Sequence, residues 1–591
     1  MSRSPADRTQ PKSYRRNKKG AKWSAGVAEW TRGGGTFSPP PSSRRTPFPK
    51  AKNPTPIAAM EAGGCDGGPM TYGQVEQLFN SFEGPTAQER IDCIVPFLVS
   101  LLPPPFVPVP DAAGDDSDDD RFSLTSSDSE DSDIGAADPA AFHPAALGDG
   151  QDHISRLPDA LLSNIISRLA TREAARTVVL STRWRGVWAA TPLLVDDAHL
   201  VDGPFDIPIV RSLSRCVAAH PGPVRAVRVT SVSFYAHEYA LQRLVKDLAD
   251  KGVQDLILLN RPWPLNMPLP DDILRCASLE RLYLGVRQFP EITAPRLPVF
   301  DKLRELGLFH CVVSDEEVDA LLAHCPKLEV FSIVMTYGGP SRLHIMSRSL
   351  RVAVDWNCML DEVVVKDAPC LERLILNTID ETERRPVKIV CAPRLKLLGF
   401  LDLNLHTLEI GGVAIKAGIN VRARAMVPSL KILAVIVQFA CSQEAKMLPT
   451  LLKCFPHLET LHVLPIPSES PNSVHDLEFW ESLGPCECLE SHLKMLVVHG
   501  CLVQTNEIGF LQYIIREGKA LKAVGLSPSP ENKVAFDLVT AIFCESNAAS
   551  DGGGSASVPL TKISGRWNFQ NSIDMSLDDP FFVDDVQLPS F

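Results

Sequence analysis

Apolar residues along this chain follow two patterns, one helical and one typical of short repeated strands. Between residues 154 and 188 they recur at a spacing that places them on one face of a helix. These positions are Leu161, Leu162, Ile165, Ile166 and Leu169. Pro158 suits the first turn of this helix, and Thr171 and Ser181 are placed as N-caps of two further short helices. Three short helices bury only a small core, so we expect one apolar face to meet a partner.

From residue 224 onward the pattern L-x-x-L-x-L recurs, with Val, Ile, Phe or Met allowed in place of Leu. It starts at Val224, Val253, Leu279, Leu303, Leu328, Leu350, Leu371 and Leu395, the copy at Leu350 being degenerate. From Leu279 to Leu395 the intervals are 24, 25, 22, 21 and 24 residues, within the period of leucine-rich repeats. Later starts at Leu405, Leu430, Leu458, Leu493 and Leu521 are less evenly spaced.

One such unit cannot cover its own apolar face, so the repeats predict a stacked solenoid with a curved parallel sheet. Return helices are expected at Ser314 to Ala323 and at Gln443 to Cys454. The Leu-type positions of each strand should point into the core, and the positions between them should face the concave side. Apolar residues on that side indicate that a partner or the chain's own tail binds there. The candidate target-binding residues are Arg281, Tyr283, Leu397, Ile432, Ala434, Ile436 and His462.

The segment from Ile154 to Trp188 resembles an F-box of the plant type. The matching residues are Leu157, Pro158, Asp159, Leu161, Leu162, Ile166, Leu169, Leu180, Ser181, Arg183, Trp184, Arg185 and Trp188. The resemblance implies docking onto a Skp-type adaptor, which links to a cullin and so brings a bound target to a ubiquitin-conjugating enzyme. The expected adaptor-binding residues are Leu157, Pro158, Leu161, Ile165, Leu180, Trp184 and Trp188. The alternative is a helical hairpin that caps the next domain.

The segment from Trp480 to Leu526 resembles the FBD region that follows leucine-rich repeats in many plant F-box proteins. The matching residues are Pro485, Cys486, Leu489, Leu493, Lys494, Gly500, Glu507, Phe510, Leu511 and Leu521. The order of the segments, F-box, repeats and then this region, is the order expected for that family. The resemblance implies no chemistry for the FBD.

Composition and charge frame this α/β reading. The 591 residues carry a net charge of −12, which argues against general nucleic-acid affinity. No apolar run reaches the 18 residues of a membrane span. The 15 cysteines lack paired spacing and follow no signal peptide, so we expect reduced thiols in a nuclear or cytoplasmic protein.

The domain organisation follows from these shifts in composition. We expect a disordered basic tail at residues 1–69, a short helical pair at 70–102, a disordered Pro-rich and acidic linker at 103–150, the F-box at 151–200, the solenoid at 201–479, the FBD-like region completing it at 480–526, and a partly disordered tail at 527–591. Residues 1–59 fit a nuclear-import patch, a transit peptide, or sequence upstream of a start at Met60. Serines among the linker's acids resemble sites for acid-directed kinases.

Candidate chemistry is sparse. Cys486, Cys488, His492, His499 and Cys501 lie close in sequence, but their spacing does not suit zinc, and no metal or cofactor is expected. No nucleophile elbow, phosphate loop or dinucleotide fingerprint occurs. The sequence therefore predicts a non-catalytic, substrate-recognition subunit of a ubiquitin ligase. The alternative is an adaptor-binding scaffold, or a repeat protein that acts outside ubiquitination.

Overall fold

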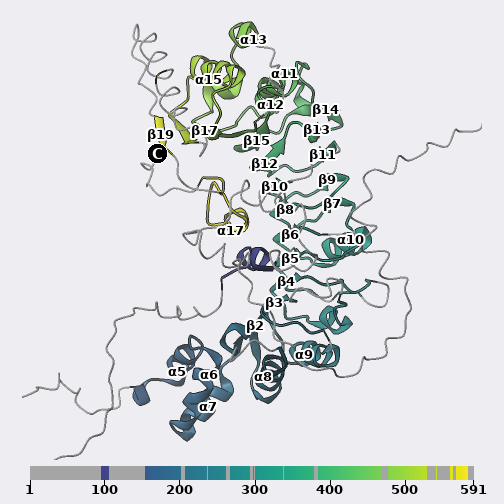
Figure 1. Ribbon diagram of the computed structural model, residues 1–591, viewed down its shortest axis with the longest axis vertical. Helices are drawn as coiled ribbons and strands as arrows, with labels where there is room; N and C mark the ends of the chain where they lie inside the picture. The colour runs from purple at the N-terminus through teal and green to yellow at the C-terminus, as the bar shows by residue number, and fades with distance from the viewer. Residues whose placement is uncertain are drawn as a thin grey trace, which may run out of the picture. The chain divides into compact units, whose positions relative to one another are not determined.

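The computed structural model describes residues 95–104, 154–200, 206–235, 237–260, 267–292, 297–298, 300–336, 339–378, 384–467, 477–528, 541, 560–562 and 567–582. Several expectations lie wholly or mostly outside these residues: the basic tail at 1–69, the first part of the helical pair at 70–102, and the Pro-rich and acidic linker at 103–150. The described residues form a small helical region followed by a large parallel sheet, as the sequence predicts (Figure 1).

The helical region contains three α-helices in the order that the sequence predicts. They are α5 (Asp159–Ile166), α6 (Thr171–Arg176) and α7 (Thr182–Ala190), with the 3-10 turns η1 (Ile154–Arg156) and η2 (Thr177–Val179). Ser181 caps α7 as expected, because its hydroxyl oxygen accepts a bond from the Trp184 amide at 3.3 Å. The expected cap at Thr171 is wrong. Ala170 holds the N-cap position, and the Thr171 hydroxyl donates to the Leu194 carbonyl at 2.7 Å.

The main sheet is built from the repeats, one parallel strand per unit. Within the described residues its strand order is β1-β2-β3-β4-β5-β6-β8-β10-β12-β15-β16-β17-β18-β19. The strands are β1 (Leu193–Asp196), β2 (Val224–Val229), β3 (Asp255–Leu259), β4 (Arg281–Gly285), β5 (Glu305–Phe309), β6 (Val330–Val334), β8 (Val352–Trp356), β10 (Arg373–Asn377), β12 (Leu397–Asp402), β15 (Ile432–Val437), β16 (Thr460–Pro465), β17 (Met495–Cys501), β18 (Ala523–Pro528) and β19 (Leu560–Lys562). Most strands begin two residues after the start of the sequence pattern.

A second sheet, of five strands, was not expected. Its order is β14-β13-β11-β9-β7, and all its pairs are parallel except β13 with β14. Its strands are β7 (Arg342–Met346), β9 (Glu362–Asp367), β11 (Arg385–Ile389), β13 (His406–Ile410) and β14 (Val413–Ala414). The pattern at Leu405 was assigned to the main sheet, and this is wrong. Its strand is β13, which lies in the return segment between β12 and β15 and pairs with β11 of the second sheet.

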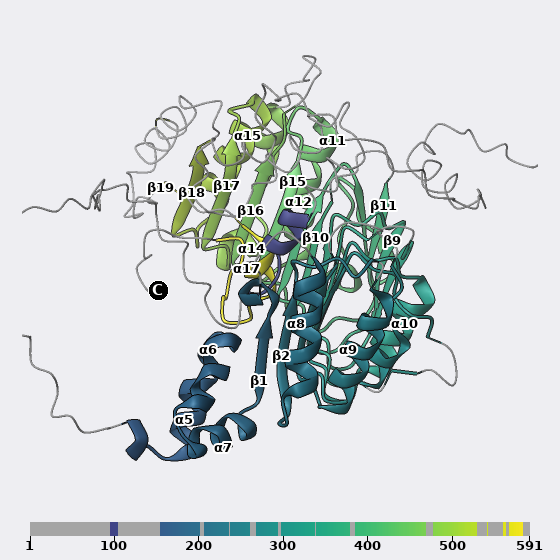
Figure 2. The ribbon, with the colours of Figure 1, turned by 60° about the horizontal axis from the view of Figure 1, so that its bottom comes forward.

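Helices cover this same side of the main sheet in several other repeats (Figure 2). The predicted return helices are present as α10 (Asp315–His324) and as the pair α11 (Ser442–Ala445) and α12 (Met447–Cys454). The others are α8 (Asp206–Ala219), α9 (Glu238–Asp250), α13 (Leu477–Ser482), α14 (Glu487–Ser491) and α15 (Thr505–Glu517), with 3-10 turns η3 (Asp197–Leu200), η4 (Asp271–Arg275) and η5 (Ala423–Ala425). Ser314 and Glu317 form a capping box that fixes the start of α10.

The solenoid core lies between the main sheet and these return segments. One continuous cluster of buried apolar side chains extends from Leu193 in β1 to Leu526 in β18. Each strand contributes its Leu-type positions, such as Leu282 and Leu284 in β4. Neighbouring units therefore cover one another's apolar faces, which is the reason for stacking.

Two further segments lie against the other side of the main sheet. They are residues 95–102, helical over 95–100, and residues 567–582, which contain α17 (Phe569–Ile573). Figure 1 shows α17 in yellow and the helical residues in purple beside the strands. We call residues 567–582 the C-terminal segment.

Candidate functional site

The helical region exposes a set of large apolar side chains. Leu161 and Ile165 of α5 are 51% and 39% exposed, and Leu180, just before α7, is 63% exposed. Ile154 and Val179 are exposed as well, as is Pro158. Exposure of so many apolar groups by one short segment is typical of a surface that a partner covers.

An ion pair joins the two ends of this surface. Asp159 at the start of α5 accepts from Arg183 in α7 at 2.7 Å, and the same guanidinium donates to the Leu157 carbonyl. The pair brings the segment that carries Pro158 next to the segment that carries Leu180. Both ion-pair partners belong to the motif quoted from the sequence, so this contact gives a structural reason for two of its polar positions.

One of the expected adaptor-binding residues, Trp184, is not available on this surface. Trp184 is 6% exposed and packs with Leu162 and Ile166 in the core of the helical region. Trp188 is half-buried, and its ring makes an edge contact with His220 at 5.0 Å between ring centroids. Because Trp188 packs against both the helical core and the solenoid core, it joins the two. Sequence reasoning missed this because both tryptophans belong to the motif and spacing does not separate core from surface.

The candidate target-binding residues lie on the side of the main sheet opposite to the return helices, as their strand phase predicts. Tyr283, Leu397, Ala434 and Ile436 are buried members of one apolar cluster there, and Ile432 packs at its edge. The same cluster contains Ile257, Phe309, Val330, Val354, Trp356, Ile375 and Phe400. We call this side the concave face. Arg281 instead pairs with Asp255 of the neighbouring strand β3.

The concave face is covered by the chain itself. Phe97, Leu98, Leu101 and Leu102 pack into its apolar cluster, and so do Phe569 and Phe581. Phe569 and Phe581 are 0% and 1% exposed, although each stands on a short segment outside the solenoid core. The chain's own segments, one of the two occupants that the sequence suggests, therefore lie on the concave face.

Aromatic rings make much of this contact. Trp567 lies 4.7 Å from both Trp356 and Phe400, measured between ring centroids. Phe569 contacts Phe309 and Trp356 edge-on at 5.4 Å. Phe581 lies 4.9 Å from Phe400. Such pairs add specific geometry to the burial of apolar area.

Polar contacts fix the path of the C-terminal segment. The Arg373 guanidinium, 5% exposed on β10, donates to the carbonyls of Ser572, Asp574 and Leu577. Burial lowers the pKa of Arg373, and the acidic side chains of the segment partly offset this effect. At the far end, His462 Nε2 lies 2.9 Å from Asp579 Oδ2. The repeats therefore contact the backbone of the C-terminal segment as well as its aromatic rings.

Burial and charge act against each other around this histidine. Burial alone raises the pKa of Asp579, but the charge and hydrogen bond of His462 outweigh it, and the pKa is lowered. His499 on β17 stacks on His462 with its Nε2 at 3.1 Å from the His462 Nδ1. Burial, together with His462, lowers the pKa of His499 to about 3. The His499 ring is therefore neutral where the segment is docked.

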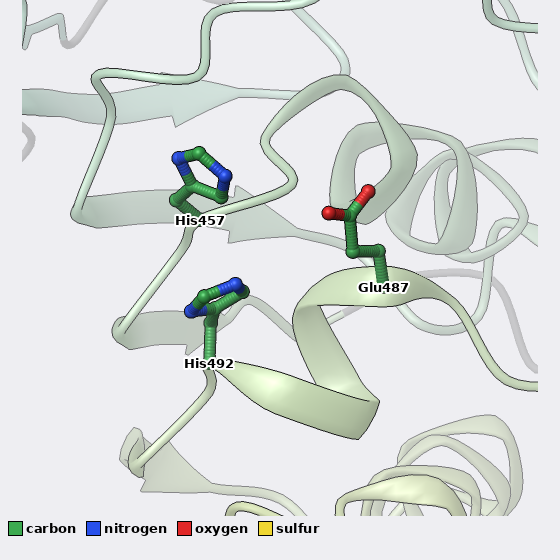
Figure 3. Close-up of side chains that lie close together, drawn as sticks. All are labelled: His457, Glu487 and His492. Atoms are coloured by element: carbon green, nitrogen blue, oxygen red, sulfur yellow. The ribbon is translucent and has the colours of Figure 1, made fainter.

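The five residues weighed as a metal group from the sequence do not converge. Cys486 and Cys488 have their sulfurs 3.4 Å apart, whereas His499 faces the C-terminal segment. Another group does come together in the described residues: His457, Glu487 and His492 have ligand atoms within 4.8 Å of one another (Figure 3). His457 stands before β16 and the other two at the ends of α14. Sequence reasoning missed this group because His457 lies 30 residues before Glu487.

Three family models match the chain. The F-box domain matches residues 154–195, the LRR repeats of the FBD-associated F-box protein At5g56370 match residues 241–463, and the FBD matches residues 481–526. The chain therefore carries an F-box, leucine-rich repeats and an FBD region, in this order. The exposed apolar surface belongs to the F-box, and β17, α15 and most of β18 fall within the FBD, which continues the solenoid.

Curated relatives carry the same combination. The chain is 26% identical to the putative F-box/FBD/LRR-repeat protein At3g49480 of Arabidopsis thaliana over 432 residues, 64% of this chain and 90% of the relative. It is 27% identical to the F-box/FBD/LRR-repeat protein At1g13570 of the same plant over 210 residues, 34% of this chain and 49% of the relative. The putative F-box/FBD/LRR-repeat protein At5g44950 is 30% identical over 38% of this chain and 52% of the relative. The matched region thus spans about half the length of several relatives.

An F-box with leucine-rich repeats indicates a protein-interaction adaptor, of the kind typically found in ubiquitin ligases. F-boxes generally bind Skp1-type adaptors, and proteins of this kind are typically receptors without catalytic activity. Among the described residues, no helix has the length and apolar character needed to cross a membrane.

Proposed function

We propose that this chain is the substrate-recognition subunit of a ubiquitin ligase built from a Skp-type adaptor, a cullin and an F-box protein. In this role the F-box binds the adaptor and the solenoid binds the target. The observation that carries the proposal is the apolar F-box surface of Pro158, Leu161, Ile165 and Leu180, exposed next to a well-packed core. A helical cap without a partner would bury these side chains instead.

The division of labour follows from where each residue packs. Leu161 and Leu180 point outward and are free to enter a partner, whereas Leu162 and Trp184 hold the helices together. Trp188 connects the F-box to the first repeat, so that a target on the solenoid keeps a defined position relative to the adaptor. The chain positions its target, and the ubiquitin-conjugating enzyme carries out the transfer.

A reconstituted ligase tests this role. The full chain is combined with a Skp-type adaptor, a cullin complex and a ubiquitin-conjugating enzyme, and ubiquitin transfer to a bound target is followed. We expect transfer with the wild-type chain and none with the Leu157→Ala and Pro158→Ala double variant. Adaptor binding without transfer to any bound partner would favour a scaffold, and absence of adaptor binding would reject the proposal.

A further inference from the structure

We propose that the C-terminal segment is an internal ligand of the concave face, and that target proteins bind this face through a segment of the same chemistry. That chemistry is a Trp and a Phe two residues apart, then an Asp and a Phe about ten residues further along. The proposal deepens the proposed function and rests on it, because only that function implies that the chain binds a target protein. The binding of the segment itself does not depend on ubiquitin transfer.

The first support is that the segment is bound as a ligand is bound. Each strand and return helix of the solenoid belongs to a repeat unit. Residues 567–582 belong to none, and they place single side chains into the apolar surface. Phe569 and Phe581 are each almost fully buried there. Few anchors with deep burial are the usual source of affinity at protein interfaces.

The second support is that buried polar groups of the repeats make hydrogen bonds to this segment. Arg373 donates to three carbonyls of residues 572–577, and the Nε2 of His462, a side chain with no exposed area, meets Asp579. A buried guanidinium or imidazole without a partner is costly. The concave face is therefore suited to hold an extended backbone and a carboxylate whenever its apolar surface is occupied.

The third support comes from residues 95–104, which extend the same cover. The Gln570 amide donates to the Leu101 carbonyl, and Arg228 of β2 donates to the Pro103 carbonyl at 2.6 Å. Phe97 and Leu98 fill the early part of the apolar cluster. A target must displace the C-terminal segment or bind beside it, so this segment sets the affinity that a target has to exceed.

Displacement is feasible because the segment is held on the concave face by noncovalent contacts, which a competing segment can replace. A tethered segment competes with a free one through its effective concentration, which the length of the tether sets. A target with the same anchors and additional contacts outside the concave face can exceed this advantage. Proteins without the aromatic and acidic pattern cannot, and the segment thus raises selectivity.

The test uses a labelled peptide of residues 567–582 and the full chain in two forms. One is the wild-type chain, and the other carries Phe569→Ser and Phe581→Ser in its own segment. We expect the variant chain to bind the peptide at least tenfold more tightly than the wild-type chain, in which the site is filled. Equal binding to both chains, or no binding to a folded variant chain, would overturn the proposal.

Peptide variants test the chemistry. Asp578 and Asp579 are neighbours, but Asp578 is exposed and Asp579 meets His462. Asp579→Asn should weaken peptide binding about tenfold or more, and Asp578→Asn should change it less than threefold. Equal effects of the two changes would contradict the assigned contact. If the double-Ser chain fails to fold, the Arg373→Gln chain with an intact segment takes its place, and faster hydrogen exchange over residues 567–582 is the expected result.

An independent observation supports a second proposal. We infer that His457, Glu487 and His492 form a binding site for a zinc-like divalent metal ion. The His457 Nδ1 lies 3.0 Å from the Pro428 carbonyl, so it carries the proton and leaves Nε2 free as a ligand. The two rings meet edge-on at 4.9 Å between centroids. Two imidazoles and one carboxylate suit zinc-like ions and leave a position open.

The three ligand atoms need to move only slightly to reach one ion. They lie within 4.8 Å of one another, and all three side chains are half-buried or exposed, which leaves them room to turn. Figure 3 shows His457 on the turn before β16, with Glu487 and His492 on the FBD side. A bound ion would connect α14 of the FBD to the preceding repeat.

Calorimetric titration of the full chain with zinc chloride tests this site. We expect micromolar binding in the wild-type chain, at least tenfold weaker binding after His492→Ala, and little change after His324→Ala at an exposed histidine elsewhere. The nearby thiols are the competing ligands. Unchanged binding in His492→Ala together with loss in Cys486→Ser would assign the ion to the cysteines and overturn the proposal, as would the absence of binding in the wild-type chain.

Discussion

His462 in β16 and Asp579 in the C-terminal segment are 117 residues apart in sequence and 2.9 Å apart in space. The contact ties the C-terminal segment to one of the later repeats. It also places a titrating carboxylate and two histidines, His462 and His499, at one end of the concave face. Docking of the C-terminal segment should therefore depend on pH.

Acidification from pH 7 to pH 5 should weaken docking of the C-terminal segment. The pKa of His499 is about 3 when the segment is docked and near its ordinary value of 6.5 when the ring is exposed. The released state then binds the extra proton, so docking is fully favoured above pH 6.5 and weakens by up to about twentyfold at pH 5. Protonation of Asp579 should weaken docking only below pH 4, because its ordinary pKa is 3.8 and its pKa in the docked state is lower still.

Binding of the 567–582 peptide to the chain with Phe569→Ser and Phe581→Ser, measured at both pH values, checks this. The His499→Gln chain is the control, because it keeps a polar group and loses the titration. Its binding should change less with pH. A wild-type His499 chain whose affinity rises on acidification would contradict the account.

Arg373→Met should release the C-terminal segment and leave the solenoid folded. The substitution keeps most of the apolar stem and removes donors to three carbonyls. A hydrogen bond to a charged group contributes about 1.5–3 kcal/mol, so the loss of these bonds should weaken docking of the C-terminal segment at least tenfold. Limited proteolysis near residue 575 should become faster, with no change in the thermal unfolding of the repeats. Protection equal to that of the wild-type chain would contradict this role.

Neighbouring positions in β15 should respond in opposite ways to a charge. Ile432 lies at the edge of the concave cluster, whereas Leu433 is 1% exposed in the solenoid core. Ile432→Lys should weaken docking of the C-terminal segment and preserve the fold. Leu433→Lys should destabilise the fold by about 4 kcal/mol or more, since it buries an unpaired charge. Thermal unfolding of both variants checks the strand phase, and the reverse order would show that the phase is wrong by one residue.

The repeat pattern predicted the main sheet well, because each Leu-type position lies in the same buried environment in every unit. Alternation along the strand is enough to place Leu282 and Leu284 in the core and Tyr283 on the concave face. The second sheet was not predictable in this way. Its strands β7, β9, β11 and β13 occupy return segments, where a strand takes the place of a helix and no regular pattern marks the difference.

The candidate site was predicted only in part, for a related reason. The sequence indicated that the concave face is apolar and named the tail, with its acidic and aromatic cluster around Phe581, as one occupant. Phe569 gave no signal of its own because its partners lie in distant repeats. Trp184 and Trp188 were assigned to the adaptor surface because they belong to the motif. Packing decides otherwise, since Trp184 fills the small F-box core and Trp188 bridges to the solenoid.

Trp184→Ala should unfold the F-box, and Leu180→Ala should not. Truncating a buried tryptophan costs about 3–5 kcal/mol, which a core of a few side chains cannot absorb. Truncating Leu180, 63% exposed, should change the stability by less than about 0.5 kcal/mol. Hydrogen exchange over residues 159–190 measures both effects. Equal protection in the two variants would show that Trp184 is not a core residue.

The affinity of the full chain for a purified Skp-type adaptor tests the central claim most directly. The variant is Leu161→Asp with Leu180→Asp, and the control is Met359→Asp, which changes an exposed apolar residue of the solenoid. Two lost anchors of about 2 kcal/mol each predict an affinity weakened roughly a thousandfold, with an unchanged circular dichroism spectrum and unchanged binding in the control. Equal adaptor affinity in all three folded proteins would contradict the assignment of this surface and of the ubiquitin-ligase role.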